Sequence, residues 1–281
     1  MFGSVKSMLT ASESVPLWRA VLEDDCRDRD ADPNASLARM TRLWQAMKQS
    51  VLDYDPTRRS ASGLSGGQGA RMAALADPIC GPFIQEAVSV ALKLGEHNAC
   101  MGRIVAAPTA GACGVLPAVL IPLQRRDGLS DDKMVECLYV AAGFGQVIAS
   151  RASISGAEGG CQAEVGSASG MAAAALVHAR GGTGEQMAAA CAMALQNVLG
   201  LVCDPVAGLV EAPCVKRNVM GAVNAMSCAD MALAGVTGVI PCDEVIDAMG
   251  AVGRLMSPSL RETGQGGLAA TPTGRKIAER R

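Results

Sequence analysis

The sequence predicts an all-α protein, and three observations lead to this fold class. Apolar residues recur at helical spacing in several segments, helix-start signals precede those segments, and aromatic residues make up only 2% of the chain. The segments between them are glycine-rich turns rather than alternating runs of β-branched residues. The 281 residues are 49% hydrophobic, which is ample for a buried core. We therefore expect a compact bundle of helices rich in alanine and glycine, joined by glycine-rich loops.

Three helices are predicted in the first half of the chain. The first begins near Ser36, a plausible cap, and is followed by apolar residues three and four apart, namely Leu37, Met40, Trp44, Met47 and Val51. The second begins at Asp77 and Pro78 and continues to about Leu94. The third begins at Ser130, followed by two carboxylates that favour the positive end of a helix dipole, and runs through the Val140 region.

Three further helices are predicted in the second half. Thr183 and Gln186 have the spacing of a capping box, so the segment after them reads as a helix that ends near Gly200. Another helix follows Arg217 and stops near Gly235. The next begins at Asp243.

The chain shows no internal linker and no repeat, which predicts a single domain over residues 1–281. Within it, residues 1–35 are expected to form a peripheral N-terminal segment. Residues 257–281 are expected to form a tail rich in turns.

Charge and cysteine content limit the partners and the location of the protein. The 25 basic and 27 acidic residues give a net charge of −2, which disfavours nucleic-acid binding. The N-terminus lacks the apolar core and cleavage site of a secretory signal, so we expect a cytoplasmic protein. In that compartment thiols stay reduced, so the 11 cysteines are not expected to form disulfides.

One stretch tests whether the chain enters a membrane. Residues 104–124 carry no charge and are long enough to span a bilayer. Pro108, Pro117 and Pro122 would interrupt the continuous hydrogen-bonded helix that lipid requires. We therefore expect no membrane span.

Three cysteines stand beside turns made by glycine or proline: Cys161, Cys203 and Cys214. Such turns can direct several thiolates toward one point. The pair spacing of a zinc site or a common ferredoxin cluster is missing, however. From the residues alone, a metal or cluster site and a set of small buried thiols both stay open.

Five segments give the sequence a family resemblance. From about Ser60 to the C-terminus it resembles the α chain, or catalytic domain, of the bacterial iron–sulfur-dependent L-serine dehydratases. The matching segments are SGLSGGQG, NACMGRIVAAPTAGACGVLPAVL, GAEGGCQAEVGSASGMAAAALV, LGLVCDPVAGLVEAPCVKRNVMGAVNA and LRETGQGGLAATPTG.

The resemblance implies a carbon–nitrogen lyase that converts L-serine to pyruvate and ammonia, which would supply pyruvate for gluconeogenesis. It also implies an oxygen-sensitive [4Fe–4S] cluster held by Cys161, Cys203 and Cys214. Cys113 lies in a glycine-rich loop and reads as a small core residue. The cysteines outside these motif positions are assigned to packing, namely Cys26, Cys80, Cys100, Cys137, Cys191, Cys228 and Cys242.

Two glycine-rich loops are expected to complete the pocket. The first offers Ser62, Ser65, Gly66 and Gly67, and the second, Pro108 to Gly111, offers the Thr109 hydroxyl and accessible backbone N–H groups. With the resemblance, we interpret Ser62, Gly66, Gly67 and Gly111 as substrate-binding and Ser65 and Thr109 as catalytic. Without it, tight turns between helices explain both loops equally well.

The general base has several candidates. His97 adjoins the NACMG segment, while Glu158 and Glu164 flank Cys161. We name His97 and Glu164 as catalytic candidates; His178, on an alanine-rich helix, is a weaker one.

Two residues after Cys214 are further candidates for substrate binding. A cation at Arg217 could stabilise the thiolates or the substrate carboxylate, and Asn218 follows it. The alternative is a solvated helix start.

Two features depart from the family pattern. Gln196 and Asn197 stand where many relatives carry Glu-His before the second cluster cysteine. The chain also lacks the additional domain of such enzymes, so we expect a separate β chain and an oligomer.

Three other interpretations stay open. A pyridoxal-phosphate enzyme would catalyse the same elimination, but no lysine lies in a glycine-rich loop after a strand. A non-catalytic subunit would use its cysteines only for packing. The same cluster could also act on threonine or cysteine, because one methyl group contributes only about 1–3 kcal/mol of discrimination.

Overall fold

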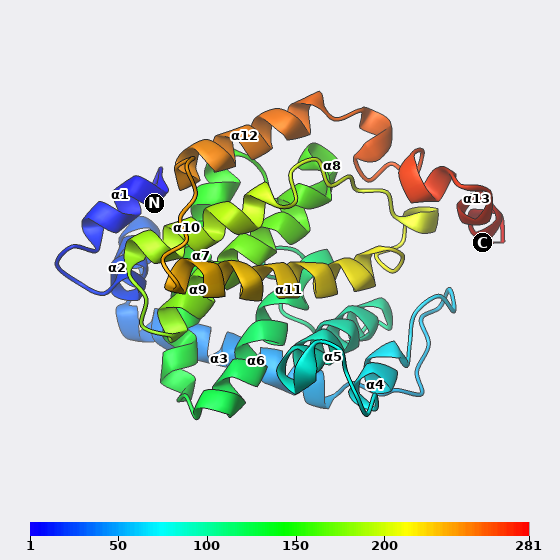
Figure 1. Ribbon diagram of the computed structural model, residues 1–281, viewed down its shortest axis with the longest axis horizontal. Coiled ribbons are helices and arrows are strands. Elements are labelled where there is room, and N and C mark those ends of the chain that lie inside the picture. The colour runs from blue at the N-terminus through cyan, green and yellow to red at the C-terminus, as the bar shows by residue number, and fades with distance from the viewer. Residues whose placement is uncertain (281) are drawn as a thin grey trace.

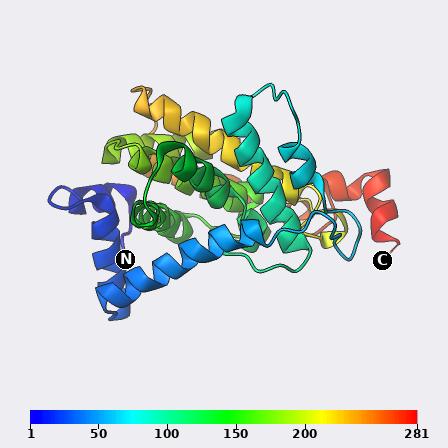
Figure 2. The same cartoon turned by 90° about the horizontal axis from the view of Figure 1, so that it is seen from below.

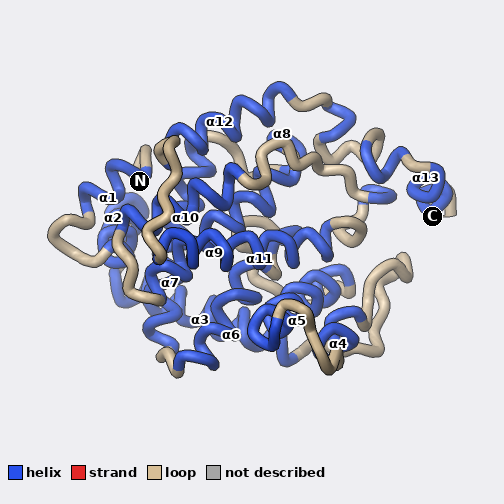
Figure 3. The backbone as a smooth tube through the Cα atoms, in the orientation of Figure 1, coloured by secondary structure: helices blue, strands red, loops and turns tan. Residues whose placement is uncertain are grey.

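Thirteen α-helices make up most of residues 1–280, which are the residues that the computed structural model describes (Figures 1 and 3). They are α1 (Val5–Ala11), α2 (Leu17–Arg29), α3 (Pro33–Leu52), α4 (Gln68–Ala73), α5 (Gly81–Ala99), α6 (Val115–Asp127), α7 (Asp131–Arg151), α8 (Gly156–Gly159), α9 (Ser167–Ala179), α10 (Gly184–Gln196), α11 (Cys214–Leu233), α12 (Cys242–Leu255) and α13 (Pro272–Ala278). The described residues contain no strand, only an isolated bridge between Cys203 and Arg261. The all-α prediction is therefore confirmed.

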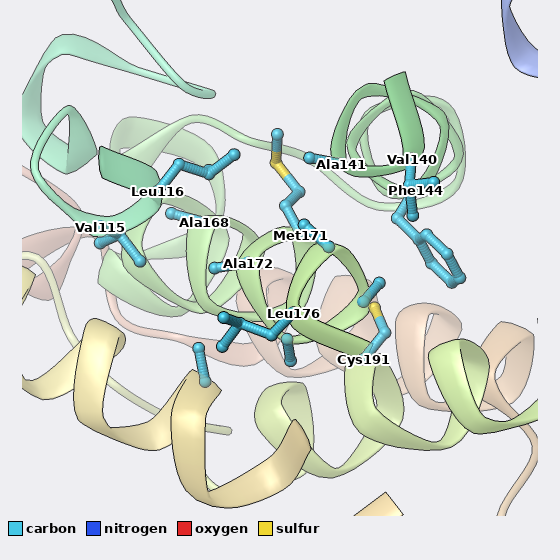
Figure 4. Close-up of a cluster of buried hydrophobic side chains, with 14 of the residues drawn as sticks. Val115, Leu116, Val140, Ala141, Phe144, Ala168, Met171, Ala172, Leu176 and Cys191 are labelled. Carbon is cyan, nitrogen blue, oxygen red and sulfur yellow. The ribbon is translucent and has the colours of Figure 1, made fainter. Parts of the chain in front are cut away.

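Helix α9 lies at the centre of the bundle. All of its residues are buried, and it packs against α6, α7, α10 and α11. Figure 4 shows Met171, Ala172 and Leu176 of this helix among side chains of its neighbours. Small residues permit this close approach, because a Cβ on Gly170 would lie only 2.9 Å from the Cys191 Sγ. The alanine and glycine content therefore serves helix packing.

Several predicted helix starts are confirmed. The Ser130 hydroxyl accepts a hydrogen bond from the Lys133 N–H at 3.1 Å, which caps α7. Thr183 and Gln186 form a complete capping box at the start of α10.

Two predicted helix starts were misplaced. Asp32 rather than Ser36 caps α3, and the buried Ser36 hydroxyl lies 2.9 Å from the Tyr139 hydroxyl. Helix α5 begins at Gly81, three residues after the predicted start at Pro78. Both errors follow from judging caps by local sequence alone.

The expectation that prolines would interrupt residues 104–124 was partly wrong. Helix α6 contains Pro117 in its first turn, where a missing N–H costs little, and Pro122 in its buried interior. Tertiary packing therefore overrides the local preference. None of the helices within residues 1–280 is long and apolar enough to cross a membrane.

Both terminal segments are helical in part. Helices α1 and α2 bury Met8 and Leu17 in the main core, and the Asp243 carboxylate accepts the Val5 N–H at 2.8 Å. After α12, the chain forms two short 3₁₀ turns, Pro258–Leu260 and Gly267–Ala270, before α13.

The long loops between α3 and α4 and between α10 and α11 lie at the end of the bundle that carries the C-terminus (Figures 1 and 2). Helices α1 and α2 lie at the opposite end. The loops that contain the family-like motifs are thus gathered away from the N-terminal helices.

Candidate active site

The candidate cluster cysteines stand at three helix junctions. Cys161 precedes a π-helical turn, Gln162–Gly166, that leads directly into α9. Cys214 is the first residue of α11, and Cys203 lies in the loop before it. Helical turns of the π type are frequent at functional sites.

The tail holds the backbone of Cys203. The Cys203 N–H donates to the Leu260 carbonyl at 2.8 Å, and its carbonyl accepts the Glu262 N–H at 2.7 Å. Glu262 has a positive φ of 63°, a conformation that side chains other than glycine adopt rarely. The LRETG motif therefore fixes the segment that carries the second cysteine.

Cys161 and Cys203 are buried and Cys214 is half-buried, and the three thiols lie near enough to affect one another's pKa. Burial raises the pKa of Cys161 to about 11 and that of Cys214 to about 12, where the Cys161 thiol adds to the effect. Burial, followed by Cys161, Glu164, Glu262 and Cys214, raises the pKa of Cys203 still further. The arrangement thus disfavours bare thiolates unless positive charge compensates them.

Three thiols are the donor type that binds iron–sulfur clusters. Within residues 1–280, no three His, Cys, Asp or Glu side chains converge closely enough to hold one metal ion. In an iron–sulfur cluster the thiolates need not converge on one point, because each thiolate binds a different iron. A Cβ on Gly156 would lie 2.6 Å from the Glu164 Oε2 and 3.0 Å from the Cys203 Sγ, so glycine keeps space open beside the thiols.

The Glu164 side chain lies beside the Cys203 thiol. Its Oε2 lies 3.9 Å from the Cys203 Sγ, and burial raises the pKa of its carboxyl group. Thr109 lies beside it, and the buried Thr109 Oγ1 has no hydrogen-bond partner of good geometry. By contrast, Glu158 is exposed and accepts a hydrogen bond from Ser153.

Arg217 supplies positive charge next to the thiols. Its guanidinium donates to the Val202 carbonyl and to Asp204, each at 2.8 Å, and lowers the pKa of Cys161 against the larger effect of burial. The Arg217 and Asp204 side chains are only 13% and 4% exposed. Asp204 also accepts the Leu268 N–H at 2.7 Å, which attaches the tail. This ion pair therefore joins α11, the Cys203 loop and the tail.

Asn218 connects the second glycine-rich loop to α11. Its Oδ1 accepts the Gly114 N–H at 2.9 Å, while its Nδ2 donates to the carbonyls of Gly111 at 2.7 Å and Cys214 at 3.0 Å. The amide is thus occupied by backbone groups. A direct contact of Asn218 or Gly111 with substrate stays a prediction.

The first glycine-rich loop is held by Glu96, a residue that sequence analysis missed. The Glu96 carboxylate accepts the N–H groups of Gly66 at 3.1 Å, Gln68 at 2.9 Å and Gly69 at 3.1 Å, as well as the Tyr54 hydroxyl at 2.7 Å. These N–H groups are the kind that would bind a substrate carboxylate. The local sequence did not single out Glu96, because the same helix also carries Glu86 and Lys93.

The serines of this loop are also engaged. Ser62 donates to Glu211, a second carboxylate that was missed although it lies in the motif that contains Cys214. Ser65 is buried, and its N–H donates to the Ser60 Oγ at 3.2 Å. Direct roles for Ser62, Ser65 and Gly67 stay predictions.

His97 lies in separate surroundings. Its buried Nε2 lacks a hydrogen-bond partner, and its ring packs against Gly102. Burial lowers its pKa, and the charged groups that act on it are Asp53 and Arg58 rather than any of the three cysteines. A catalytic role for His97 stays a prediction without support from its contacts. His178 contacts Lys133 and Glu136, at 3.1 and 3.0 Å.

Comparisons with known proteins give consistent matches. The serine dehydratase alpha chain family matches residues 12–269. The probable L-serine dehydratase alpha chain of Bacillus subtilis is 58% identical over 285 aligned positions, covering all of this chain and 95% of that one. The L-serine dehydratase alpha chain of Peptoniphilus asaccharolyticus is 52% identical, covering 71% of this chain and 68% of that one. The L-serine dehydratase of Mycobacterium tuberculosis is 48% identical over 64% of this chain but only 40% of its own length.

Proposed function

This chain belongs to the serine dehydratase alpha chain family, and on that premise we propose that it deaminates L-serine to pyruvate and ammonia. Water is eliminated first, by loss of the α-proton and the β-hydroxyl. The resulting aminoacrylate tautomerises to an imine, which water hydrolyses. Atoms balance without an oxidant or a reductant.

The observation that supports the proposal is that Cys161 and Cys214 both lie near enough to Cys203 to raise the pKa of its thiol. These three thiolates would hold a [4Fe–4S] cluster. When bound, such a cluster leaves one iron without a protein ligand and supplies a Lewis acid for the departing hydroxide. The Arg217 guanidinium offsets part of the negative charge of the thiolates.

Among the candidate bases, the Glu164 carboxylate has the best position. Its Oε2 lies next to Cys203, and a base there can accept the α-proton of a substrate bound beside the thiols. The Thr109 hydroxyl lies beside the Glu164 carboxylate, where it can also hydrogen-bond the substrate. Asn218 keeps the Gly111–Gly114 segment in place around it.

We further propose that a separate β chain assembles with this chain, in an oligomer in the cytoplasm. The support is that several relatives are named alpha chains. In addition, the proteins named L-serine dehydratase in Mycobacterium tuberculosis and Streptomyces coelicolor are each matched over only 40% of their own length.

The test is anaerobic purification of the chain together with its β chain, reconstitution with iron and sulfide, and assay of pyruvate formation from L-serine. L-threonine and L-cysteine are assayed in parallel, because pocket volume sets this choice. We expect turnover of L-serine that exposure to air abolishes. Borohydride trapping of a lysine adduct would instead indicate a pyridoxal enzyme.

A further inference from the structure

Glu211 is a buried carboxylate that the proposed chemistry does not use. It is 7% exposed and lies three residues before Cys214. Its Oε2 accepts a hydrogen bond from the Ser60 Oγ at 2.6 Å, and its Oε1 accepts one from the Ser62 Oγ at 2.8 Å. Hydroxyls from a single loop thus engage both oxygens of a buried anion.

That loop connects α3 to α4 and is held at both ends. Glu211 binds its first part, whereas Glu96 binds the N–H groups of Gly66 near its end and of Gln68 at the start of α4. The loop also closes on itself, because the Ser60 N–H donates to the Ser65 carbonyl at 3.0 Å. Its conformation therefore depends on two carboxylates from outside the loop.

The backbone of Glu211 belongs to the turn that presents Cys214. The Glu211 carbonyl accepts the Val215 N–H at 3.0 Å in the first turn of α11, and the neighbouring Ala212 carbonyl accepts the Val206 N–H at 2.9 Å. The Glu211 side chain is therefore connected through its own backbone to the Cys214 turn. The carboxylate joins a loop rich in hydroxyl and N–H groups to one corner of the thiol site.

We propose that Glu211 is a positioning residue, which holds the loop of residues 60–67 against the Cys214 turn so that the loop can enclose the substrate. This inference rests on the proposed function, because its kinetic consequence requires serine to bind at this site. Without the two hydrogen bonds, the loop populates open conformations, and part of the binding energy is spent on closing it. The loss should therefore appear in KM more than in kcat.

The test compares Glu211→Ala and Ser62→Ala with Glu13→Gln, a control at an exposed position in the N-terminal part of the chain. Arg58 and Arg59 are exposed and stand directly before Ser60, so trypsin cleavage after them reports opening of the loop. We expect cleavage there, followed by mass spectrometry, to be about tenfold faster or more in both variants. We also expect KM for L-serine to rise about tenfold, with kcat within about threefold of wild type and iron content unchanged.

Two additional variants separate positioning from general destabilisation. Glu211→Gln keeps the side-chain length and one acceptor oxygen, so it should restore part of the KM and of the trypsin resistance. Adding Ser62→Ala to Glu211→Ala should raise KM no further, because Glu211→Ala already removes the hydrogen bond that Ser62 makes. If Glu211→Ala does not fold, changing both Ser60 and Ser62 to alanine removes the two hydrogen bonds from the loop side.

The inference would be overturned if trypsin cleavage and KM matched those of Glu13→Gln. It would also be overturned if the Glu211 variants lost iron together with activity, because Glu211 would then support the cluster itself. If wild type forms no pyruvate, the proposed function fails, while the trypsin measurement still decides whether Glu211 holds the loop.

Discussion

Replacing Glu164 with glutamine is expected to lower kcat for L-serine by about 10²- to 10⁴-fold, which is the usual contribution of a positioned general base. The carboxylate lies beside Cys203 in a buried site, and glutamine keeps its shape without its ability to accept a proton. The measurement is steady-state kinetics under anaerobic conditions on protein of known iron content. Iron and sulfide should match wild type.

Glu158→Gln is the matched control, because Glu158 stands on the other side of Cys161 but is exposed. Its kcat should remain within about threefold of wild type, since surface substitutions have small effects. A Glu164→Gln protein with nearly normal kcat would show that Glu164 is not the general base. His97 would then be the next candidate base to test.

Replacing Arg217 with methionine is expected to lower the free energy of unfolding by about 3–5 kcal/mol, because it leaves the Asp204 carboxylate buried and unpaired. It also removes the cation next to Cys161, so reconstituted protein should retain less iron. Urea unfolding of the protein without its cluster measures the first effect, and iron analysis measures the second.

Arg180→Met tests whether burial causes this loss. Arg180 is 49% exposed and pairs with Asp127 at 2.6 Å, so its removal should change stability by about 0–1 kcal/mol. Adding Asp204→Asn to Arg217→Met should recover part of the stability, because no unpaired charge would remain. Equal losses from Arg217→Met and Arg180→Met would contradict the role given to the buried pair.

Features encoded by neighbouring residues could be predicted from the sequence. The capping box at Thr183 needs only Thr183 and Gln186, and helix α11 stops just before Gly235, which has a φ of 86°. The start of α3 was harder, because Asp32 and Ser36 are both good caps and packing against Tyr139 decides between them. Pro122 shows the same limit, since a buried position outweighs its local preference.

For the candidate site too, local sequence predicts some residues but not their long-range contacts. Resemblance of short motifs singled out the three cysteines and Glu164, but not the contacts that hold the loops around them. Ser60 and Glu211 are 151 positions apart, and Gly66 and Glu96 are 30 apart, so only the folded chain reveals these pairs. The two buried carboxylates had no motif spacing that local reasoning could use.

The proposed cluster depends on the three thiols. Its most direct test measures the iron and acid-labile sulfide bound per chain after anaerobic purification. The test compares wild type, Cys203→Ser and Cys228→Ser. Cys228 is a buried thiol on α11 with Asn224 Oδ1 at 3.6 Å, so a serine there would have a hydrogen-bond partner. Wild type and Cys228→Ser should each hold about four irons and four sulfides, and Cys203→Ser should hold almost none. Wild type without iron after reconstitution, or Cys203→Ser with a full complement, would contradict the three-thiolate cluster.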